Sequence, residues 1–359
     1  MGLATFLTRT KGNPDKADRI GAADLLAYGY LALGVLLILV PVLWTFLSSV
    51  KNERAVSSFD TRLLPMSQVE RLIEGEGLKT TWIYTDAAGN TQEVFKAGPT
   101  RVETDVAAID DPANVFKVPR TQLEPNEEIR IATENYLDPI LGRNGQTNFT
   151  FFTYLFNSVF VTVVATLITL LINAMAAFAL SKYQFRGRLT FTILIVATLL
   201  IPSSIILVSL FFVVWSFGIF GSLWGVIIPA AATPTGVFLL RQYMLTIPDE
   251  LLEAARMDAA SEWRIFWRIV LPLSLPALSV LAILSVIWRW NDFLWPLIVL
   301  ISDPSAHTLQ IGLTTFSGEF DSQFHYILAM TVVSLIPITL VFVWLQRFIT
   351  TGIATTGLK

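Results

Sequence analysis

Six long apolar runs constrain this chain more than any other feature of its sequence. A helix needs about 20 mostly apolar residues to cross roughly 30 Å of hydrocarbon, and each run approaches or exceeds that length. The pattern predicts an all-α polytopic membrane protein with six transmembrane helices. The six runs are Leu25–Ser49, Phe156–Leu180, Leu189–Phe217, Ser222–Leu240, Leu275–Ile301 and Tyr326–Leu345.

The composition excludes several other classes of protein. Charged residues make up only 15% of the chain and hydrophobic residues 53%, whereas soluble domains carry about 25% charged residues. A net charge of −3 gives no reason to expect nucleic acid as a partner. The chain has no cysteine and only two histidines, His307 and His325, which excludes thiolate chemistry and a histidine-based metal site. Because no catalytic constellation stands out in the spans, we expect no catalytic, cofactor-binding or metal-binding residues in this chain.

Basic residues in the short segments predict the orientation of the spans. They precede the first run and follow the second, the fourth and the sixth, whereas the segments Gly218–Gly221 and Ser302–His325 contain none. Both terminal segments, 1–24 and 349–359, are therefore expected to be cytoplasmic. The first run is too long for a cleavable signal peptide and lacks a cleavage site after it, so an uncleaved span at 25–50 is predicted.

The segment 51–149 breaks this pattern, because it is long and polar and carries 11 basic and 16 acidic residues. Long loops cross a membrane largely regardless of charge, so we expect an external insert between the first and second spans. Ser67–Glu76 is predicted as a short helix that begins at a serine N-cap. Thr80–Tyr84 and Gln92–Lys96 are predicted as a hairpin around a turn at Ala87–Asn90. Together they predict a small external α+β domain, and a loosely ordered loop is the alternative.

The loop 247–273 between the fourth and fifth runs has the sequence of two short helices. Pro248 and the two acidic residues after it suit a helix N-terminus, and this first helix is expected to run to Ala260. Its four alanines make it slim enough for another backbone to approach closely, and Glu253 projects from that surface. From the periodicity alone, a connector resting on lipid headgroups explains the loop equally well.

Ser261 is predicted as the N-cap of the second helix. In that helix one apolar stripe is followed by Pro272, and two arginines, Arg264 and Arg268, lie on another face. This arrangement is typical of a helix that lies in the plane of the membrane interface. The stripe consists of Trp263, Phe266, Trp267 and Val270.

Particular residues of this loop match a long and specific motif. The segments Glu253-Ala254-Ala255, Asp258, Ile269 and Leu271-Pro272 resemble the EAA loop of permease subunits of binding-protein-dependent ABC importers. Their spacing and their place before the fifth of six spans both match. One position departs from the family pattern, which usually has Gly where this chain has Ala259. An alanine there makes the bend between the two helices harder to build, or moves it toward Ala260–Ser261.

Other segments resemble the carbohydrate branch of these importers, in particular the smaller maltose-permease-like subunit. They include Asn157-Ser158, Phe185-Arg186-Gly187-Arg188 and Trp290-Asn291-Asp292-Phe293. The resemblance covers 25–51 and 151–359 and leaves out the insert. It implies one permease half of a carbohydrate importer in the inner (cytoplasmic) membrane. A permease for a non-sugar solute is the alternative, as is a membrane sensor with an external ligand-binding domain.

The resemblance also implies partners and a coupling site. The partners are a second permease subunit, a dimer of ATPase subunits, an extracytoplasmic solute-binding protein, membrane lipid and the carbohydrate substrate. ATP and Mg²⁺ are expected on the ATPase, because this chain has no G-x-x-x-x-G-K-[ST] phosphate loop. The residues implied in coupling to the ATPase are Glu253, Ala254, Ala255, Arg256, Asp258, Ala259 and Pro272.

Polar residues and a proline inside the predicted spans are candidates for the translocation path, since such groups are costly in hydrocarbon. Arg289 and Asp292 are three residues apart, so a self-neutralising pair, with Asn291 bonded to a neighbouring helix, is the other interpretation. A proline in mid-span frees a backbone carbonyl and can bend the helix around a cavity. The candidates are Asn173, Pro202, Ser203, Asn291 and Asp292.

Overall fold

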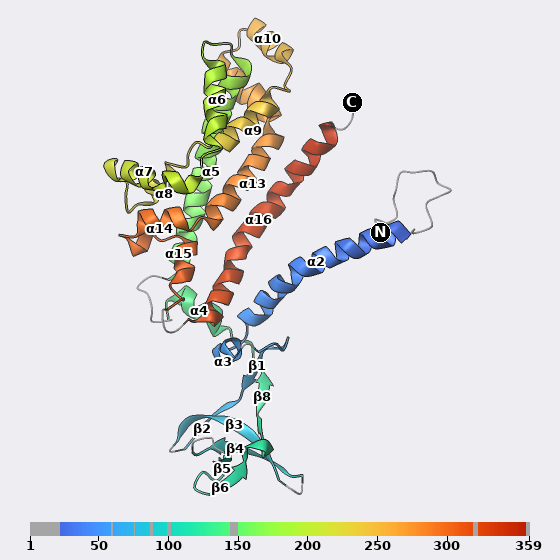
Figure 1. Ribbon diagram of the computed structural model, residues 1–359, viewed down its shortest axis with the longest axis vertical. Helices are drawn as coiled ribbons and strands as arrows, with labels where there is room; N and C mark the ends of the chain where they lie inside the picture. The colour runs from blue at the N-terminus through green and yellow to red at the C-terminus, as the bar shows by residue number, and fades with distance from the viewer. Residues whose placement is uncertain are drawn as a thin grey trace. The chain divides into compact units, whose positions relative to one another are not determined.

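The computed structural model describes residues 22–58, 60–74, 76–86, 89–98, 102–143, 150–318 and 322–356, without the side chains of 22, 23, 203 and 347–356. Contacts divide the chain into two compact units (Figure 1). The first comprises Met1–Lys51 and Thr61–Arg130, and the second comprises Asn52–Asp60 and Ile131–Lys359. Each unit has hydrophobic clusters of its own.

The first unit contains α2 (Ala22–Ser49), an apolar helix with Pro41 inside it. Most of its described side chains are exposed, which suits a helix surrounded by hydrocarbon. Beyond its end the side chain of Lys51 is only 1% exposed. The Nζ atom of Lys51 donates to the carbonyl of Arg62 at 2.6 Å and lies 4.8 Å from the ring centroid of Trp44. These contacts attach the end of α2 to the chain that enters the strands.

The rest of the first unit is antiparallel sheet. Five strands follow one another in the order β2-β3-β4-β5-β6, β7 pairs with β3, and β1 pairs separately with β8. Inward-facing β-branched residues, Val94, Val106 and Val118, are at most 2% exposed and form the core between the strands. The strands are β1 (Met66–Gln68), β2 (Glu70–Ile73), β3 (Gly77–Thr85), β4 (Thr91–Lys96), β5 (Glu103–Ala108), β6 (Val115–Pro119), β7 (Leu123–Pro125) and β8 (Glu127–Ile129).

The predicted hairpin is confirmed and the predicted helix at Ser67–Glu76 is wrong. Strands β3 and β4 pair with Trp82 opposite Val94, although two residues of the predicted turn, 87 and 88, lie outside the described residues. The predicted helix is two strands, because β1 finds a partner in β8, far along the chain, and β2 pairs back on β3. Such tertiary pairing overrides local helix signals.

The second unit is helical and surrounds the long helix α5 (Phe151–Lys182), as Figure 1 shows. Two short helices of the segment 51–149 belong to this unit rather than to the sheet. They are α3 (Glu53–Ser57) and α4 (Glu134–Leu141). The remaining helices are α6 (Arg188–Thr198), α7 (Ser203–Ser216), α8 (Leu223–Ile227), α9 (Pro234–Met244), α10 (Asp249–Met257), α11 (Glu262–Ile265), α12 (Leu271–Leu273), α13 (Leu275–Asn291), α14 (Leu294–Leu300), α15 (Leu309–Thr314) and α16 (Phe324–Thr356).

Three of the six predicted spans are single helices and three are broken. The first, second and sixth runs form α2, α5 and α16, which are the three described helices long and apolar enough to cross a membrane alone. The third run breaks before Pro202 into α6 and α7, the fourth into α8 and α9, and the fifth into α13 and α14. One bent pair, Glu262–Leu273 with Leu275–Asn291, turns by 76° and would make a fourth span. The count of six therefore stays a prediction.

The two chain segments that enter and leave the sheet run side by side, which makes an excision possible. The N–H of Arg130 donates to the carbonyl of Pro65 at 2.9 Å, next to the paired residues Met66 and Ile129. We expect replacement of residues 66–129 by a short Gly–Ser linker to leave the thermal unfolding of the helical unit unchanged. The full-length variant Val94→Asp, which places a carboxylate in the buried core of the sheet and is expected to unfold the sheet alone, serves as the control. A large fall in the melting temperature of the excised protein would show that the helices depend on the sheet.

Candidate functional site

The loop after α9 folds into the two predicted helices, and Figure 1 shows α10 at one end of the helical unit. The first helix, α10, begins directly after Pro248 with two acidic residues in its first turn, where the helix dipole favours negative charge. The second helix begins at Ser261, whose Oγ accepts from the N–H of Arg264 at 3.3 Å. The predicted serine N-cap is thereby confirmed. A π-helical segment, η3 (Phe266–Val270), then leads into α12.

One face of α10 is exposed while the other is fixed in the core. Leu252 is only 2% exposed and packs in one hydrophobic cluster with Phe178 of α5, Leu240 of α9 and Leu281 of α13. The second helix adds Ile265, Phe266 and Val270 to the same cluster. On the opposite side of α10 the exposed residues are Glu250, Glu253, Ala254 and Met257, with Asp258 after them. The loop therefore presents a slim acidic surface on a helix that cannot shift without its neighbours.

The bend between the two helices lies at Ala259. This residue adopts φ +56°, the only positive value among the described residues other than glycine. An L-residue with a Cβ atom pays roughly 1–2 kcal/mol in this left-handed region. The alternative expectation, that alanine moves the bend toward Ala260–Ser261, is therefore wrong. The chain keeps the bend where the family usually has Gly and accepts the strain.

Two side chains, Arg256 and Tyr183, bond to Glu262 and hold the two helices together. Arg256 donates to both carboxylate oxygens of Glu262, at 2.8 and 3.3 Å, and the hydroxyl of Tyr183 donates to the same carboxylate at 2.6 Å. These bonds, that of Arg256 first, hold the pKa of the Glu262 carboxyl below its ordinary value. Burial, followed by the bond to Glu262, raises the pKa of Tyr183 to about 12. Arg256 thus points into the loop.

The end of α5 is attached to the start of α10. The Nζ atom of Lys182 donates to the carbonyl of Ile247 at 2.5 Å and to Oδ1 of Asp249 at 2.7 Å. The last carbonyls of α5 accept further bonds, since Arg188 and Arg241 both donate to the carbonyl of Leu180, at 2.9 and 3.2 Å. Cations at a helix C-terminus offset its dipole. No local pattern predicts these pairings, because the partners are up to 67 residues apart in the chain.

At its far end the loop turns sharply into α13. Pro272 lies in α12, which continues directly from the π-helical segment η3. The two helical segments on either side of Ser274 meet at 76°. Pro272 and the bend thereby fix the direction in which the loop joins the spans.

Among the path candidates, Asn173 is fully buried. Its Nδ2 donates to Oγ1 of Thr233 at 2.8 Å, and its Oδ1 accepts from the N–H of Thr233 at 3.1 Å. Thr233 is the N-cap of α9. Asn173 therefore joins α5 to the start of α9, and the structure favours this bonded interpretation over exposure to a path.

Arg289 does not form the self-neutralising pair with Asp292. Its guanidinium donates to the hydroxyls of Ser285 at 2.6 Å and Thr169 at 2.7 Å, and to the carbonyl of Ala230 at 2.6 Å. Within the described ranges no ion pair joins it to Asp292. The carbonyl of Ala230 is free to accept because the fourth run is broken between α8 and α9. Arg289 therefore links the broken segment to α5 and α13.

The remaining candidates lie at breaks in the helices. Pro202 is exposed and caps α7 at the break in the third run, as its effect on the backbone predicts. Ser203 begins α7, and its side chain lies outside the described residues. Asn291 is exposed but donates to Ile287 of its own helix at 2.8 Å, so its predicted bond to a neighbouring helix is wrong. Asp292 ends α13, with its Oδ1 3.4 Å from the N–H of Trp295. Roles for these residues in transport stay predictions.

The described residues show no metal centre, since no three His, Asp or Glu side chains converge in them. The described loop offers no nucleophile with an adjacent base, which is the arrangement that covalent catalysis needs. What the site does offer is an exposed helix with a rigid connection to several long helices. Such an arrangement suits mechanical coupling to another protein.

Comparison with known proteins gives consistent relatives. Residues 172–355 match the family described as "Binding-protein-dependent transport system inner membrane component". The arabinooligosaccharides transport system permease protein AraQ of Halalkalibacterium halodurans is 38% identical over 209 residues, which cover 58% of this chain and 75% of AraQ. The sn-glycerol-3-phosphate transport system permease protein UgpE of Yersinia enterocolitica is 33% identical over 250 residues, covering 69% of this chain and 87% of UgpE.

The fold also matches a solved structure. A chain of a bacterial ABC transporter involved in the import of the acidic polysaccharide alginate aligns with a TM-score of 0.63 and 22% identity. The alignment covers 92% of this chain and 98% of that chain. At this identity the likeness concerns the fold alone.

Because the bend at Ala259 is strained, substitution by glycine should change the stability of the loop in opposite directions at two nearby alanines. We expect Ala259→Gly to stabilise the loop by about 1 kcal/mol, because glycine adopts positive φ without a Cβ clash. Ala254→Gly, inside α10, should instead destabilise it by about 1 kcal/mol. Hydrogen exchange of the loop amides in the purified protein measures both. Equal destabilisation by the two changes would contradict the assigned bend.

The contact between α5 and α9 leads to another prediction. A Cβ atom on Gly236 would lie 2.1 Å from Nδ2 of Asn173 and 2.6 Å from Oγ1 of Thr233. We expect Gly236→Ala to lower the stability of the protein by about 2 kcal/mol, through overpacking and loss of the Asn173 bonds. Gly29→Ala in α2, where no atom lies within 4 Å, is the matched control. Equal melting temperatures for the two variants would refute the tight contact.

Proposed function

We propose that this chain, which belongs to the family of inner membrane components of binding-protein-dependent transport systems, forms half of the translocation pathway of an ATP-driven carbohydrate importer. Its family makes it a multi-pass permease subunit. A second permease subunit supplies the other half. A dimer of ATPase subunits on the cytoplasmic side binds ATP and Mg²⁺. A solute-binding protein delivers the substrate from outside. Both termini of this chain are cytoplasmic.

The observation that supports this proposal is the fixed packing of α10. Leu252 shares one buried cluster with residues of α5, α9 and α13. A displacement of α10 is therefore transmitted directly to these three helices. Close-packed cores transmit displacement because they have few voids to absorb it. Closure of the ATPase dimer would displace α10, and the attached helices would follow as a rigid body. This is a two-state change driven by a ligand bound elsewhere.

The exposed surface of α10 determines the kind of groove that fits it. The small side chain of Ala254 allows close approach, and Met257, which is 88% exposed, offers an adaptable apolar contact. Glu250, Glu253 and Asp258 give this surface a negative charge. Glu253 forms no hydrogen bond or ion pair with the described residues, so it is available to a basic group on the ATPase. Such a pair fixes register more than it adds affinity.

Arg256 and Ala259 take different roles from Glu253 in this proposal. Arg256 is bonded to Glu262 within the loop, so it maintains the angle between α10 and the second helix rather than contacting the ATPase. Ala259 sets the bend between those helices, and Pro272 sets the turn into α13. The coupling residues thus divide into two groups. Glu253, Ala254 and Asp258 form the contact surface, and Arg256, Ala259 and Pro272 maintain the angles of the loop.

A carbohydrate is the proposed solute class. AraQ carries the name of an arabinooligosaccharide system and UgpE that of a glycerol phosphate system. These names support a sugar or a related polyhydroxylated solute for this chain, and an oligosaccharide is the first choice. A phosphorylated polyol is the second candidate, since UgpE is similar over more of this chain than AraQ. Uptake assays with labelled sugars and glycerol phosphate in a strain carrying the whole importer separate the two.

Charge reversal on α10 tests the coupling role. We expect Glu253→Lys to reduce uptake at least tenfold while membrane insertion remains normal, because a lysine would face the basic groove of the ATPase and repel it. Transport in membrane vesicles and the amount of inserted protein are measured together. Glu103→Lys, the same charge change at an exposed position of the sheet, should leave both unchanged. Normal uptake by Glu253→Lys would rule out the proposed contact.

Cross-linking identifies the partner directly, because the chain contains no cysteine. Met257→Cys places a thiol on α10 at a position that is 88% exposed, and Val102→Cys places one in the sheet unit at 89% exposure. A bifunctional thiol–amine reagent should join Met257→Cys, and not Val102→Cys, to a nucleotide-hydrolysing subunit. Capture of lipid alone from position 257 would show that α10 rests on the membrane instead.

A further inference from the structure

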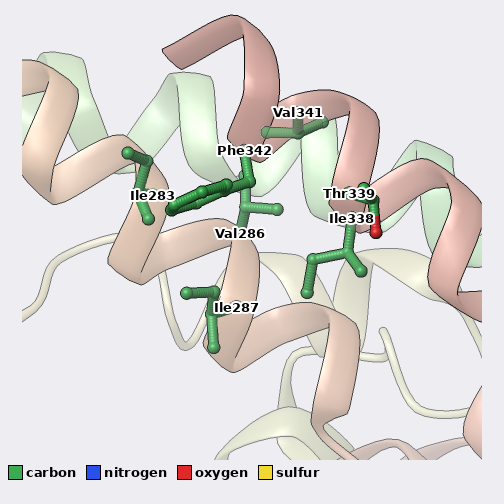
Figure 2. A pocket seen from close by; sticks show the side chains of 7 residues that line it. All are labelled: Ile283, Val286, Ile287, Ile338, Thr339, Val341 and Phe342. Atoms are coloured by element: carbon green, nitrogen blue, oxygen red, sulfur yellow. The ribbon is translucent and has the colours of Figure 1, made fainter. Parts of the chain in front are cut away.

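The helical unit carries an apolar groove away from the coupling surface. It has a volume of about 640 Å³ and is lined by residues of α5, α13 and α16, together with Trp267 and Leu271 of the loop. This volume lies within the range of ligand pockets, about 300–1,000 Å³. A smaller pocket of about 210 Å³ adjoins it and shares Val286 and Val341 with it. Figure 2 shows this pocket between α13 and α16, with almost purely hydrocarbon side chains around it.

The groove offers almost no hydrogen bond to an occupant. Its two hydroxyl residues are already bonded: Oγ1 of Thr166 lies 2.9 Å from Oγ of Ser285, and Oγ of Ser279 donates to the carbonyl of Leu275 at 2.8 Å. A sugar placed here would lose its bonds to water without replacement, at a cost of a few kcal/mol for each group. A hydrocarbon chain would lose nothing. The groove therefore selects against the transported solute and for an acyl chain.

Two arginines are neighbours of Trp267 on the helical segment that borders one end of the groove. Trp267, which lines it, has Arg264 three residues before it and Arg268 directly after it on the same helical segment. Both arginines are exposed, and neither forms a hydrogen bond or ion pair with a described residue. The nearest acid in the sequence, Glu262, is occupied by Arg256 and Tyr183. The two exposed arginines are therefore available to an anionic group at this end of the groove.

Aromatic side chains mark the same end as a membrane interface. Trp263, Phe266 and Trp267 contact one another with ring centroids 5.4 to 5.9 Å apart. Across the groove Trp344 of α16 forms another wall and is 60% exposed. Tryptophan concentrates at the level of lipid headgroups. An occupant would therefore have its polar part beside Trp267 and its apolar part along α5, α13 and α16.

We propose that this groove binds an anionic phospholipid of the cytoplasmic leaflet, with an acyl chain between α5, α13 and α16 and the phosphate at Arg264 and Arg268. The charge of the headgroup complements the two arginines, and the groove accepts the chain. Since this helical segment follows α10 after the bend at Ala259 and carries Glu262, a lipid held here would also restrain the contact between Arg256 and Glu262 in the coupling loop. This inference goes beyond the proposed function, because it does not depend on the solute.

Native mass spectrometry of the full chain in its detergent-purified complex tests the proposal. Dioleoyl phosphatidylglycerol and dioleoyl phosphatidylcholine, which differ in headgroup charge but not in chains, are titrated separately. We expect phosphatidylglycerol to bind more tightly. Arg268→Gln should weaken its binding about fivefold, and the double variant Arg264→Gln/Arg268→Gln roughly 25-fold, since each arginine near an anionic surface contributes about 1 kcal/mol. Binding of phosphatidylcholine should not change.

Two controls separate the groove from general charge effects. Arg186→Gln removes an exposed arginine of the α5–α6 connection that does not border the groove, and it should leave both titrations unchanged. Leu167→Trp narrows the groove at a residue that is 62% exposed, so the fold should tolerate it while lipid retention falls. An unchanged melting temperature confirms that tolerance. Equal loss from Arg186→Gln and Arg268→Gln would overturn the proposal.

The alternative occupant is a helix of another subunit. A photo-reactive amino acid placed at Leu167 should capture phospholipid from the intact complex. Capture of a protein subunit at this position would overturn the proposal, as would equal affinity for the two lipids.

Discussion

A buried contact holds the loop 247–273 against the ends of α5, α9 and α13, and it sets the position of every other part of the site. Leu252 of α10 and Phe266 of the second helix pack against Phe178 and Leu240, so the loop is part of the core rather than a free connector. The hydrogen bonds around Glu262 and the contacts of Lys182 add direction to this apolar packing. In the proposed function, this packing is what would carry a displacement of α10 to the attached helices.

A second constraint is the need to satisfy polar backbone groups where spans are broken. The break between α8 and α9 exposes the carbonyl of Ala230, and Arg289 and Thr169 both donate to it. Asn173 and Thr233 close the same region at the start of α9. Unsatisfied groups of this kind cost several kcal/mol in hydrocarbon. The costly intramembrane arginine is therefore explained by the irregular backbone that it supports.

The lipid groove and the coupling surface use the same loop in different ways. α10 exposes acidic residues and Ala254, whereas the second helix has exposed arginines and tryptophans and borders an apolar groove with Trp267. The two helices meet at Ala259, whose left-handed conformation sets the angle between them. If both proposals hold, lipid binding and ATPase contact would each act on the angle between the two helices at this bend. The chain keeps this strained conformation of Ala259 although it lowers the stability of the loop, so the angle between the two helices is the property that is preserved.

Local signals were enough to predict the membrane class, the two helices of the loop, the Ser261 cap and the β3–β4 hairpin, because hydropathy, caps and alternation are read over a few residues. The family was also predicted in this way, through a motif whose spacing is local. Three other features appear only in the folded chain: Ser67–Glu76 forms strands, Arg289 binds Ala230 instead of pairing with Asp292, and Arg256 bonds to Glu262. Each of these depends on partners that are brought together by folding, or on the direction in which a side chain points, and no local pattern specifies either. The bend at Ala259 belongs here as well, since packing on both sides holds an alanine where local preference would not.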